Sequence, residues 1–306
     1  MRTIKPAVAV LRLGRPHFLA GGLILYCLGV AVAGYQGVPI NVTLLLWGQV
    51  AVTAIQWATH YSNDYFDLAA DQINLTPTWW SGGSRVLVEG LLAPQVALYV
   101  ALLCSALALG ATLVLTAALK APPLTAGILL FALFLGWSYS APPLRLHSRG
   151  AGELVSSLLV AGLTPLTGYY LQAGRLDALP LLAAAPLVCL QVATMLAVEY
   201  PDLAADVAVG KRTLTVRLGA ERAVRLNVAV LVAALVILPP AVALGLPALA
   251  AGAVLLSGVP LAAWQLWRLR QGAWRRPECW QGVTTRGILL IALPAAAELA
   301  AFVWLM

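Results

Sequence analysis

Long runs of apolar residues recur along almost the whole chain, and short polar stretches separate them. A run of about 18 or more apolar residues is long enough to cross the hydrocarbon core of a bilayer as a helix. We therefore predict nine membrane-spanning helices, at residues 17–35, 43–62, 94–118, 123–141, 152–171, 180–200, 224–246, 247–269 and 284–305. Prolines fall near several of their ends, as at Pro39, Pro122 and Pro180, and residues 245–247 (GLP) mark the turn between the seventh and eighth spans.

The composition agrees with this pattern. Of the 306 residues, 61% are hydrophobic and 10% are charged, and the mean hydropathy is +0.88, whereas soluble domains contain about 25% charged residues. No polar stretch is long enough to form a soluble domain, so we predict an all-α integral membrane protein with one membrane domain over residues 1–306. The four cysteines and three histidines are scattered, and their spacing gives no indication of zinc, haem or iron–sulfur ligation.

The basic residues lie on one side of the predicted topology. With nine spans, all but two of the 19 Lys and Arg residues fall on the side of the N-terminus, and only Lys120 and Arg175 fall on the other side. Cytoplasmic loops carry such an excess of Lys and Arg, so we expect the N-terminus to be cytoplasmic. Membrane topology then explains the net charge of +7, and no nucleic-acid partner is expected.

A polar stretch, residues 60–71 (HYSNDYFDLAAD), ends the second span and opens what we call the first acidic motif, residues 60–93. In a continuous helix each residue turns by about 100°. Asn63, Asp64, Asp67 and Asp71 would then share one stripe roughly 100° wide along the helix. Because like charges at this spacing repel one another, a positive partner is expected beside the stripe.

The same pattern occurs again in the second acidic motif, residues 199–222. Residues 199–206 (EYPDLAAD) match residues 64–71 (DYFDLAAD) at six of eight positions. Asp202 and Asp206 thereby correspond to Asp67 and Asp71, and both stretches lie where a span meets the same loop face. We interpret them as two copies of one motif, one in each of two related halves of the chain that surround a central cavity.

The residue types of the two motifs indicate binding of Mg²⁺ and phosphate. Mg²⁺ prefers oxygen ligands, usually binds one or two protein carboxylates and completes its shell with phosphate. Two acidic faces that point at each other could therefore hold Mg²⁺ ions that bridge one diphosphate. Each motif also contains a basic segment with glycine, residues 81–85 (SGGSR) and residues 210–213 (GKRT). Such segments suit phosphate oxygens, although the same Lys and Arg residues could simply be cytoplasmic charges.

The pattern Asn63-x-x-x-Asp67-x-x-x-Asp71, the later Asp202-x-x-x-Asp206 and the nine spans resemble the UbiA-type intramembrane prenyltransferases over nearly the whole chain. Residues 15–16 (RP) and 139–145 (YSAPPLR) are also similar to that family. Within it, residues 81–85 and 210–214 (GKRTL) most resemble the 1,4-dihydroxy-2-naphthoate polyprenyltransferase branch of menaquinone synthesis. Residues 139–144 are similar to chlorophyll synthases as well.

The resemblance implies Mg²⁺-dependent transfer of an isoprenoid chain from a polyprenyl diphosphate to an aromatic acceptor, most closely a dihydroxynaphthoate or another quinone precursor. It implies a site that opens to the cytoplasmic side of a bacterial or archaeal cell membrane, with the lipid bilayer and these small molecules as partners and no obligate protein partner. The implied metal ligands are Asn63, Asp67, Asp71, Asp202 and Asp206.

The resemblance also implies roles for further residues. The diphosphate would be bound by Asn63, Ser84, Arg85, Arg145, Lys211 and Arg212. Asp67, Asp71, Asp202 and Asp206 would act in catalysis through the metal, and Asp64 would be an acceptor-side base or a support of the metal ligands. The ring face of Tyr139 would stabilise the allylic cation.

Two alternatives remain open at this stage. The first is the same chemistry on another acceptor, such as a chlorophyllide-, hydroxybenzoate- or haem-like molecule. The second is a membrane transporter for a divalent cation or an anionic substrate, because repeated halves and acidic residues in the membrane also occur in transporters. A transport site is expected near the bilayer midplane, whereas both acidic stretches fall at the ends of spans, and this placement favours the enzyme.

Overall fold

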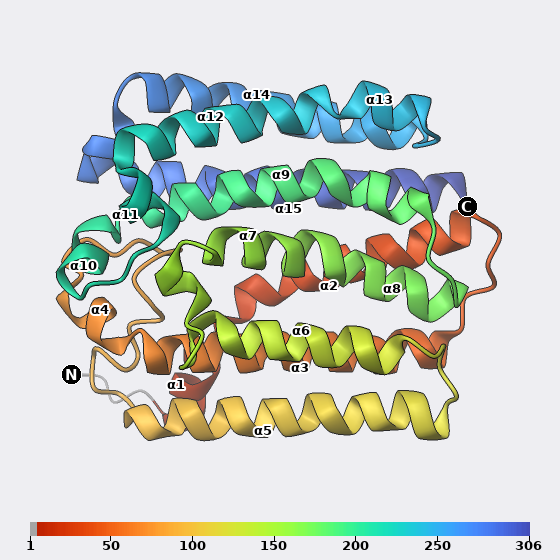
Figure 1. Cartoon of the computed structure of the whole chain (residues 1–306), viewed down its shortest axis with the longest axis horizontal. Coiled ribbons are helices and arrows are strands. Elements are labelled where there is room, and N and C mark those ends of the chain that lie inside the picture. The colour runs from red at the N-terminus through yellow and green to blue at the C-terminus, as the bar shows by residue number, and fades with distance from the viewer. Residues whose placement is uncertain (1–4) are drawn as a thin grey trace.

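The computed structural model describes residues 5–306, and every regular element in this range is helical. The long helices run side by side, and most loops and short helices gather at one end of the bundle (Figure 1). In chain order the helices are α1 (Pro6–Leu13), α2 (Pro16–Tyr35), α3 (Val42–Phe66), α4 (Leu68–Ile73), α5 (Pro94–Leu113), α6 (Thr125–Ser140), α7 (Gly152–Ser157), α8 (Thr164–Ala173), α9 (Ala178–Glu199), α10 (Leu203–Ala208), α11 (Leu214–Leu218), α12 (Ala220–Val236), α13 (Leu238–Ala243), α14 (Ala248–Arg270) and α15 (Pro277–Leu305). Single turns of tighter or wider helix lie at Val114–Ala118, Leu146–Arg149, Leu158–Leu163 and Ala273–Arg275.

Several helices begin at residues that satisfy free backbone N–H groups. The Asn41 side chain accepts a hydrogen bond from the Leu44 amide over 3.1 Å at the start of α3. Asp177 caps α9 and Thr213 caps α11 in the same way. Such caps stabilise a helix by about 1 kcal/mol each. The Thr213 cap thereby fixes the end of the loop that carries Lys211.

The predicted spans agree closely with the structure. Within residues 5–306, eight helical segments of 20 to 29 residues are apolar enough to cross a membrane. The last one begins at Pro277 and not at residue 284 as predicted, because proline is well suited to the first turn of a helix. The fourth predicted span corresponds to α6, which has 16 residues; at 1.5 Å per residue it is about 24 Å long.

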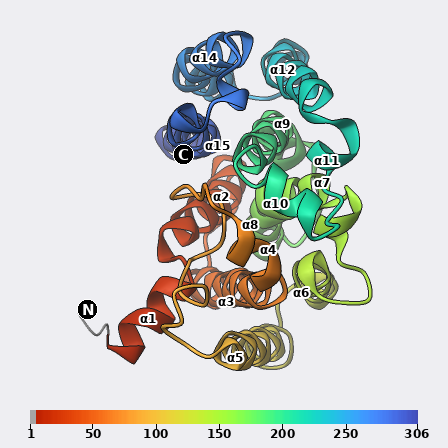
Figure 2. The same cartoon turned by 90° about the vertical axis from the view of Figure 1, so that its left-hand side faces the viewer.

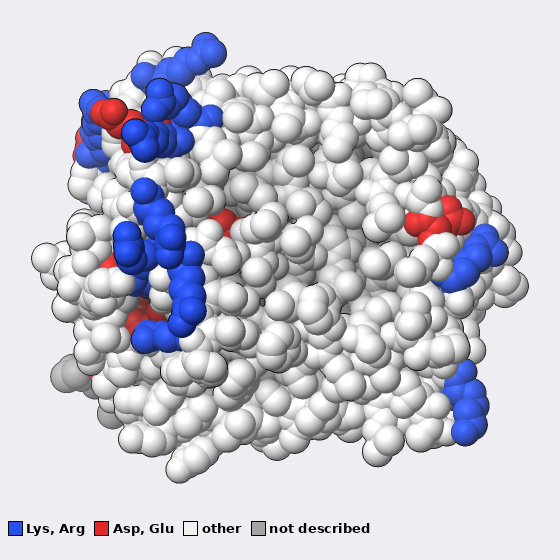
Figure 3. All heavy atoms as spheres, in the orientation of Figure 1, with Lys and Arg blue, Asp and Glu red and all other residues white. Residues whose placement is uncertain are grey.

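The surface of the molecule has the charge distribution of an integral membrane protein. In Figure 3 the charged residues gather at the two ends, most of them at one end, and a broad band between the ends carries almost none. Large apolar side chains are exposed on the long helices, among them Leu103, Phe131, Leu256 and Trp304. Burying such a band in lipid removes it from water.

The helices that surround the site lie in the middle of the bundle. Figure 2 shows α12 and α14 at one edge and α5 at the other, with α2, α3, α9 and α15 between them. Close approach of α2 and α8 depends on glycine, because a Cβ atom at Gly29 would overlap the Pro165 carbonyl and one at Gly168 would overlap the Tyr26 carbonyl. At one end of the bundle α4 and α10 contact each other over its centre (Figure 2).

Candidate active site

A cavity of about 510 Å³ lies beneath α4 and α10. Its mouth is lined by the polar residues of both acidic motifs, and its deeper part is lined by apolar side chains from α2, α3, α6 and the helical stretch between α7 and α8: Leu25, Val52, Ile55, Leu129 and Leu163. The cavity therefore combines a charged entrance with a shaft that suits a hydrocarbon.

The first acidic motif is not one continuous helix, and the prediction of a single stripe was wrong in this respect. Helix α3 ends at Phe66, Asp67 adopts φ −95° and ψ 0°, and α4 begins at Leu68. Asn63, Asp67 and Asp71 line the cavity, but Asp64 does not. The motif thus divides its carboxylates between the cavity and a second, structural contact.

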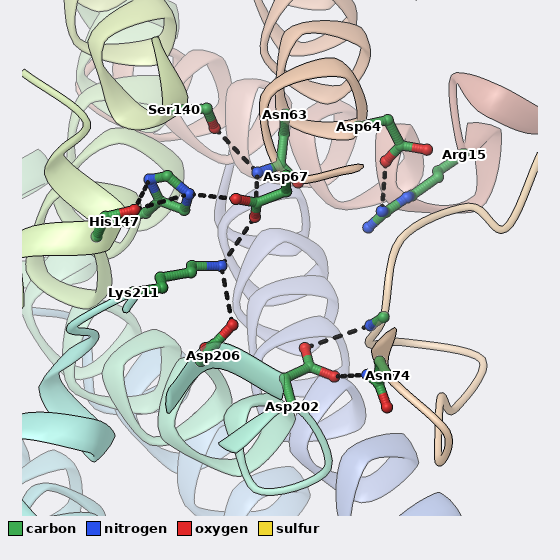
Figure 4. A network of polar contacts seen from close by, with 12 residues as sticks. Arg15, Asn63, Asp64, Asp67, Asn74, Ser140, His147, Asp202, Asp206 and Lys211 are labelled. Carbon is green, nitrogen blue, oxygen red and sulfur yellow. Dashed lines mark hydrogen bonds and ion pairs between the residues drawn. The ribbon is translucent and has the colours of Figure 1, made fainter. Parts of the chain in front are cut away.

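Asp67 is the centre of the polar network at the mouth (Figure 4). Its Oδ1 accepts a hydrogen bond from His147 Nε2 over 2.6 Å, and its Oδ2 lies 2.8 Å from Lys211 Nζ. The Asn63 amide donates to the same Oδ2 over 3.1 Å and to Ser140 Oγ over 2.9 Å. Burial alone would raise the pKa of Asp67, but Lys211 and His147 hold this pKa well below its usual range. Asp67 is therefore a fixed negative charge.

The second acidic motif enters the site through a break after α9. Pro201 has no N–H to continue the helix, and α10 begins at Leu203. Asp202 accepts a hydrogen bond from the Asn74 amide over 2.7 Å and another from the Gly82 backbone N–H over 3.3 Å. Both donors follow α4, so the first motif directly holds a carboxylate of the second (Figure 4).

Lys211 joins the two acidic faces. Its ammonium lies 2.8 Å from Asp67 and 3.5 Å from Asp206, and only 15% of its side chain is exposed. Burial would lower the pKa of Lys211, but the two carboxylates raise it above its usual value. Burial also raises the pKa of Asp206, although Lys211 opposes this shift. Lys211 is thus one positive partner of the two acidic faces.

The protein does not fully stabilise the ionised forms of Asp71 and Asp202. Burial, together with the charges of Asp67 and Asp64, raises the pKa of Asp71 to about 8. Burial and the charge of Asp206 raise the pKa of Asp202 to about 7. A cation between the two acidic faces would relieve this repulsion.

The glycine-rich segment after α4 fits closely around Asp71. Gly83 adopts φ +74°, and a Cβ atom at this position would overlap the Asp71 carboxylate. Arg85 donates to the Asp71 backbone oxygen over 2.6 Å and to the Gly82 oxygen over 3.4 Å. Arg85 thus holds the loop that carries the two glycines and does not line the cavity.

Asp64 does not line the cavity but forms a buried ion pair with Arg15, which does. Its Oδ1 lies 2.6 Å from the Arg15 guanidinium, and its Oδ2 accepts a hydrogen bond from the Ser84 backbone N–H over 3.1 Å. The exposed fractions of the two side chains are 14% for Arg15 and 3% for Asp64. Asp64 therefore fastens the start of α2 and the glycine-rich segment to α3.

The remaining candidates lie around the mouth at different depths. Tyr139 lines the cavity, and its ring centre is 5.4 Å from that of His147. Arg145 lies beside a smaller depression on the outer side of Asp67. Arg145 and Arg212 have exposed side chains and do not line the main cavity.

Sequence reasoning missed three side chains that shape the site. His147 was set aside as one of three scattered histidines, although it follows residues 139–145 by only two positions. Asn74 lies just beyond the repeated pattern, and nothing in its spacing points to Asp202. Arg15 was singled out only as part of the family resemblance at the start of the first span, without a role in the site. Their roles depend on contacts between helices that are distant in sequence.

The donor set suits a metal ion that is bound together with a phosphate. Among residues 5–306, no group of three His, Cys, Asp or Glu side chains lies close enough to hold a metal ion alone. Each acidic face instead presents one or two carboxylates to a shared space. One or two carboxylates are what a protein usually contributes to a Mg²⁺ site that also binds phosphate.

Comparison with known proteins gives consistent matches. A family model described as the UbiA prenyltransferase family matches residues 22–281. The chain is 25% identical to a 1,4-dihydroxy-2-naphthoate octaprenyltransferase of Bacillus subtilis over 215 residues, which cover 70% of this chain and 67% of that protein. It is 32% identical to a digeranylgeranylglyceryl phosphate synthase of Pyrococcus furiosus over 221 residues, which cover 68% of each chain.

Solved structures show the same fold. A UbiA homologue from Aeropyrum pernix superposes with a TM-score of 0.70 at 17% identity, over 93% of this chain and 97% of that one. A UbiA homologue from Archaeoglobus fulgidus, solved with GPP and Mg²⁺, superposes with a TM-score of 0.66 at 15% identity, over 95% and 99% of the two chains.

Proposed function

Because the chain belongs to the UbiA prenyltransferase family, whose members are prenyltransferases, we propose that it transfers an isoprenoid chain from a polyprenyl diphosphate to an aromatic acceptor within the membrane. The observation that carries the proposal is the pairing of two acidic faces with an apolar shaft in one cavity. An isoprenyl diphosphate has the same division between a charged head and a hydrocarbon tail.

Mg²⁺ is the proposed cofactor, and Asn63, Asp67, Asp71, Asp202 and Asp206 are the residues that would hold it with the diphosphate. The raised pKa values of Asp71 and Asp202, which a bound cation would lower, support this assignment, as does the Mg²⁺ bound with GPP in the Archaeoglobus fulgidus homologue. When bound, Mg²⁺ would take up the negative charge that develops on the departing diphosphate.

The protein's own cations would add to this effect. Lys211 lies between the two faces and would contact the diphosphate, while Arg145 and Arg212 would act from the exposed rim. Ser84 and Arg85 would shape the glycine-rich segment so that its backbone faces the phosphate oxygens. Asp64 would support the metal ligands through Arg15 and the Ser84 backbone.

The acceptor is proposed to be aromatic because aromatic rings line one wall of the cavity. Phe18 stacks on His60 with ring centres 5.6 Å apart, and Trp80 meets Phe18 edge-on at 5.5 Å. His17 and Tyr139 also line the cavity. Such a wall suits a flat ring, and the Bacillus subtilis relative is named for a dihydroxynaphthoate.

The topology proposed from the sequence has nine spans and a cytoplasmic N-terminus, in a bacterial or archaeal cell membrane. Figure 1 shows α1 and the C-terminal end of α15 at opposite ends of the bundle, which requires an odd number of crossings, and α6 lies alongside α3. With α6 counted as a span, the acidic mouth would open toward the cytoplasm, where the basic residues gather.

The direct test is transfer by the purified protein. We expect a prenylated product from a long-chain polyprenyl diphosphate and 1,4-dihydroxy-2-naphthoate, detected by mass spectrometry, only when Mg²⁺ is present. Asp67→Ala and Asp202→Ala should abolish turnover without unfolding the protein. A parallel assay with geranylgeranylglyceryl phosphate as the acceptor tests the function named for the Pyrococcus furiosus relative. Product from that lipid alone would overturn the aromatic acceptor, and full activity in excess EDTA would overturn the mechanism.

A further inference from the structure

Two arginines contact one tryptophan where α14 and α15 pack together, outside the candidate active site. The guanidinium carbon of Arg286 lies 4.0 Å from the centre of the Trp264 ring, and that of Arg268 lies 5.7 Å from a ring centre of the same residue. None of these three residues lines the cavity. Figure 2 shows α14 at one edge of the bundle with α15 beside it. Both arginines are partly exposed, so the cluster lies at the border of the bundle.

The two arginines carry positive charge that no acidic residue balances in the part of the chain that the structure describes. Neither forms an ion pair there. Arg268 donates a hydrogen bond to Cys279 Sγ over 2.9 Å, and its buried Nε has no acceptor among the described residues. Arg275, at the same end of the bundle, instead pairs with Glu221 over 2.6 Å. Because a guanidinium has five N–H donors in a fixed fork, Arg268 and Arg286 have donors available for an oxyanion.

Arg286 lies well inside its helix, and its side chain points back toward the helix start. The 29 residues of α15 make a helix about 43 Å long, close to the thickness of a bilayer with its headgroup regions. Arg286 lies about 13 Å along the axis from Pro277, which begins the helix. A Cβ atom at Gly282, one turn nearer the start, would lie 3.6 Å from Arg286 Nη1. Long basic side chains near helix ends reach the headgroup level in this way.

Apolar side chains on both helices are exposed on the inner side of the arginines. Leu293 follows Arg286 by two turns on the same face of α15 and is exposed, as are Leu256 and Val259 of α14. Tryptophan is enriched at the headgroup level of membrane proteins, which is the level expected for Trp264. The cluster therefore matches the order of a phospholipid, with positive charge at the depth of the phosphate and apolar surface at the depth of the acyl chains.

We propose that Arg268, Arg286 and Trp264 bind the phosphate of an anionic phospholipid in the leaflet that borders this end of the bundle. Guanidinium forks pair with phosphate oxygens through parallel hydrogen bonds, and the Trp264 ring holds both guanidinium groups in place. A headgroup with net negative charge is favoured, because the two positive charges repel the ammonium group of a zwitterionic headgroup. The inference does not depend on the proposed prenyl transfer.

The bound headgroup would also steady the loop that borders the cavity. Gln281 and Thr285 lie within about one turn of Arg286 on α15. Gln281 Oε1 accepts a hydrogen bond from the Trp79 backbone N–H over 3.0 Å, and Thr285 Oγ1 accepts one from Trp80 Nε1 over 2.9 Å. Trp80 lines the cavity. A lipid that holds this part of α15 should therefore raise the melting temperature of the protein.

The purified full-length protein in detergent tests the proposal. Native mass spectrometry measures the Kd for phosphatidylglycerol and for phosphatidylcholine with the same acyl chains, and thermal unfolding measures the stabilisation by each. We expect tighter binding of phosphatidylglycerol and a larger rise in Tm. The double variant Arg268→Gln and Arg286→Gln should weaken binding of phosphatidylglycerol by about 30-fold. The matched control is Arg270→Gln with Arg276→Gln, which removes the same charge from exposed side chains at this end of the bundle and should bind nearly as the wild type does.

Equal affinity of the wild type for the two lipids would overturn the proposal, and so would equal losses in the two double variants. Glycerol 3-phosphate is a soluble source of the same phosphate chemistry, and stabilisation by it as large as by phosphatidylglycerol would overturn the lipid as the ligand. A phosphatidylglycerol with a photoreactive diazirine in its headgroup tests the wild type without any variant that could fail to fold. We expect labelled peptides to contain residues 264–268 or 282–286, and labelling confined to other segments would overturn the assignment.

Discussion

Lys211 offers the sharpest test of how charge is balanced in the site, because its one ammonium group pairs with two carboxylates that are largely buried. Its Nζ lies 2.8 Å from Asp67 and 3.5 Å from Asp206, and the exposed fractions are 15% for Lys211, 11% for Asp67 and 4% for Asp206. Removing one partner of a buried ion pair costs about 3–5 kcal/mol, since the other charge is left without compensation. We expect Lys211→Gln to lower the thermal stability of the metal-free protein by a corresponding amount.

The same substitution should make stability depend on the metal. Asp67 and Asp206 lose their cation in Lys211→Gln, so Mg²⁺ should raise the melting temperature of this variant more than that of the wild type. In the proposed function Lys211 would also supply fixed positive charge to the leaving diphosphate, and loss of one such group typically lowers kcat by about 10²- to 10³-fold. Thermal unfolding in detergent, with EDTA and with Mg²⁺, and a prenyl-transfer assay measure the two effects.

Arg212→Gln is the matched control for Lys211→Gln. It removes a positive charge at the next position, but the Arg212 side chain is exposed and does not line the cavity. We expect stability close to that of the wild type. If Lys211→Gln and Arg212→Gln melt at the same temperature in EDTA and respond equally to Mg²⁺, the reasoning about the lysine bridge is refuted.

Three further variants test other parts of the site. Gly83→Ala should lower kcat at least about 10-fold. A Cβ atom there would overlap the Asp71 carboxylate, and the left-handed backbone costs about 1–2 kcal/mol in a non-glycine residue. An unchanged kcat would show that the segment does not touch Asp71. His147→Ala should weaken binding of a diphosphate analogue, measured by calorimetry, because Asp67 loses its 2.6 Å partner, and equal affinity would remove His147 from the site. Asp64→Asn should lower the free energy of unfolding by about 3–5 kcal/mol, because Arg15 is left buried and unpaired. Metal binding should change little. A loss of metal binding without a loss of stability would make Asp64 a metal ligand.

The sequence predicted the spans well because hydropathy is a local property. Each long apolar run became a helix near the predicted position, although α3 and α15 are longer than predicted, with 25 and 29 residues, and α6 is shorter, with 16. The repeated pattern at Asp67 and Asp202 also pointed correctly to two segments that meet, since α4 and α10 contact each other.

The direction of each side chain could not be predicted in the same way. Asp64 and Asp67 are three residues apart, yet one pairs with Arg15 from α2 and the other with Lys211 from the loop before α11. Which partner each carboxylate meets depends on how distant helices pack, and residue spacing along one helix does not contain that information. The same holds for Asn74, whose amide reaches Asp202 across 128 positions of sequence.

We propose that the two acidic faces hold Mg²⁺ and an isoprenyl diphosphate together. Calorimetric titration of the purified protein with a non-hydrolysable geranyl thiolodiphosphate, with and without Mg²⁺, tests it most directly. We expect tight binding of the thiolodiphosphate only when Mg²⁺ is present, and loss of this binding in Asp67→Ala and in Asp202→Ala alike. Equal affinity without Mg²⁺, or full affinity after removal of either face, would contradict the claim.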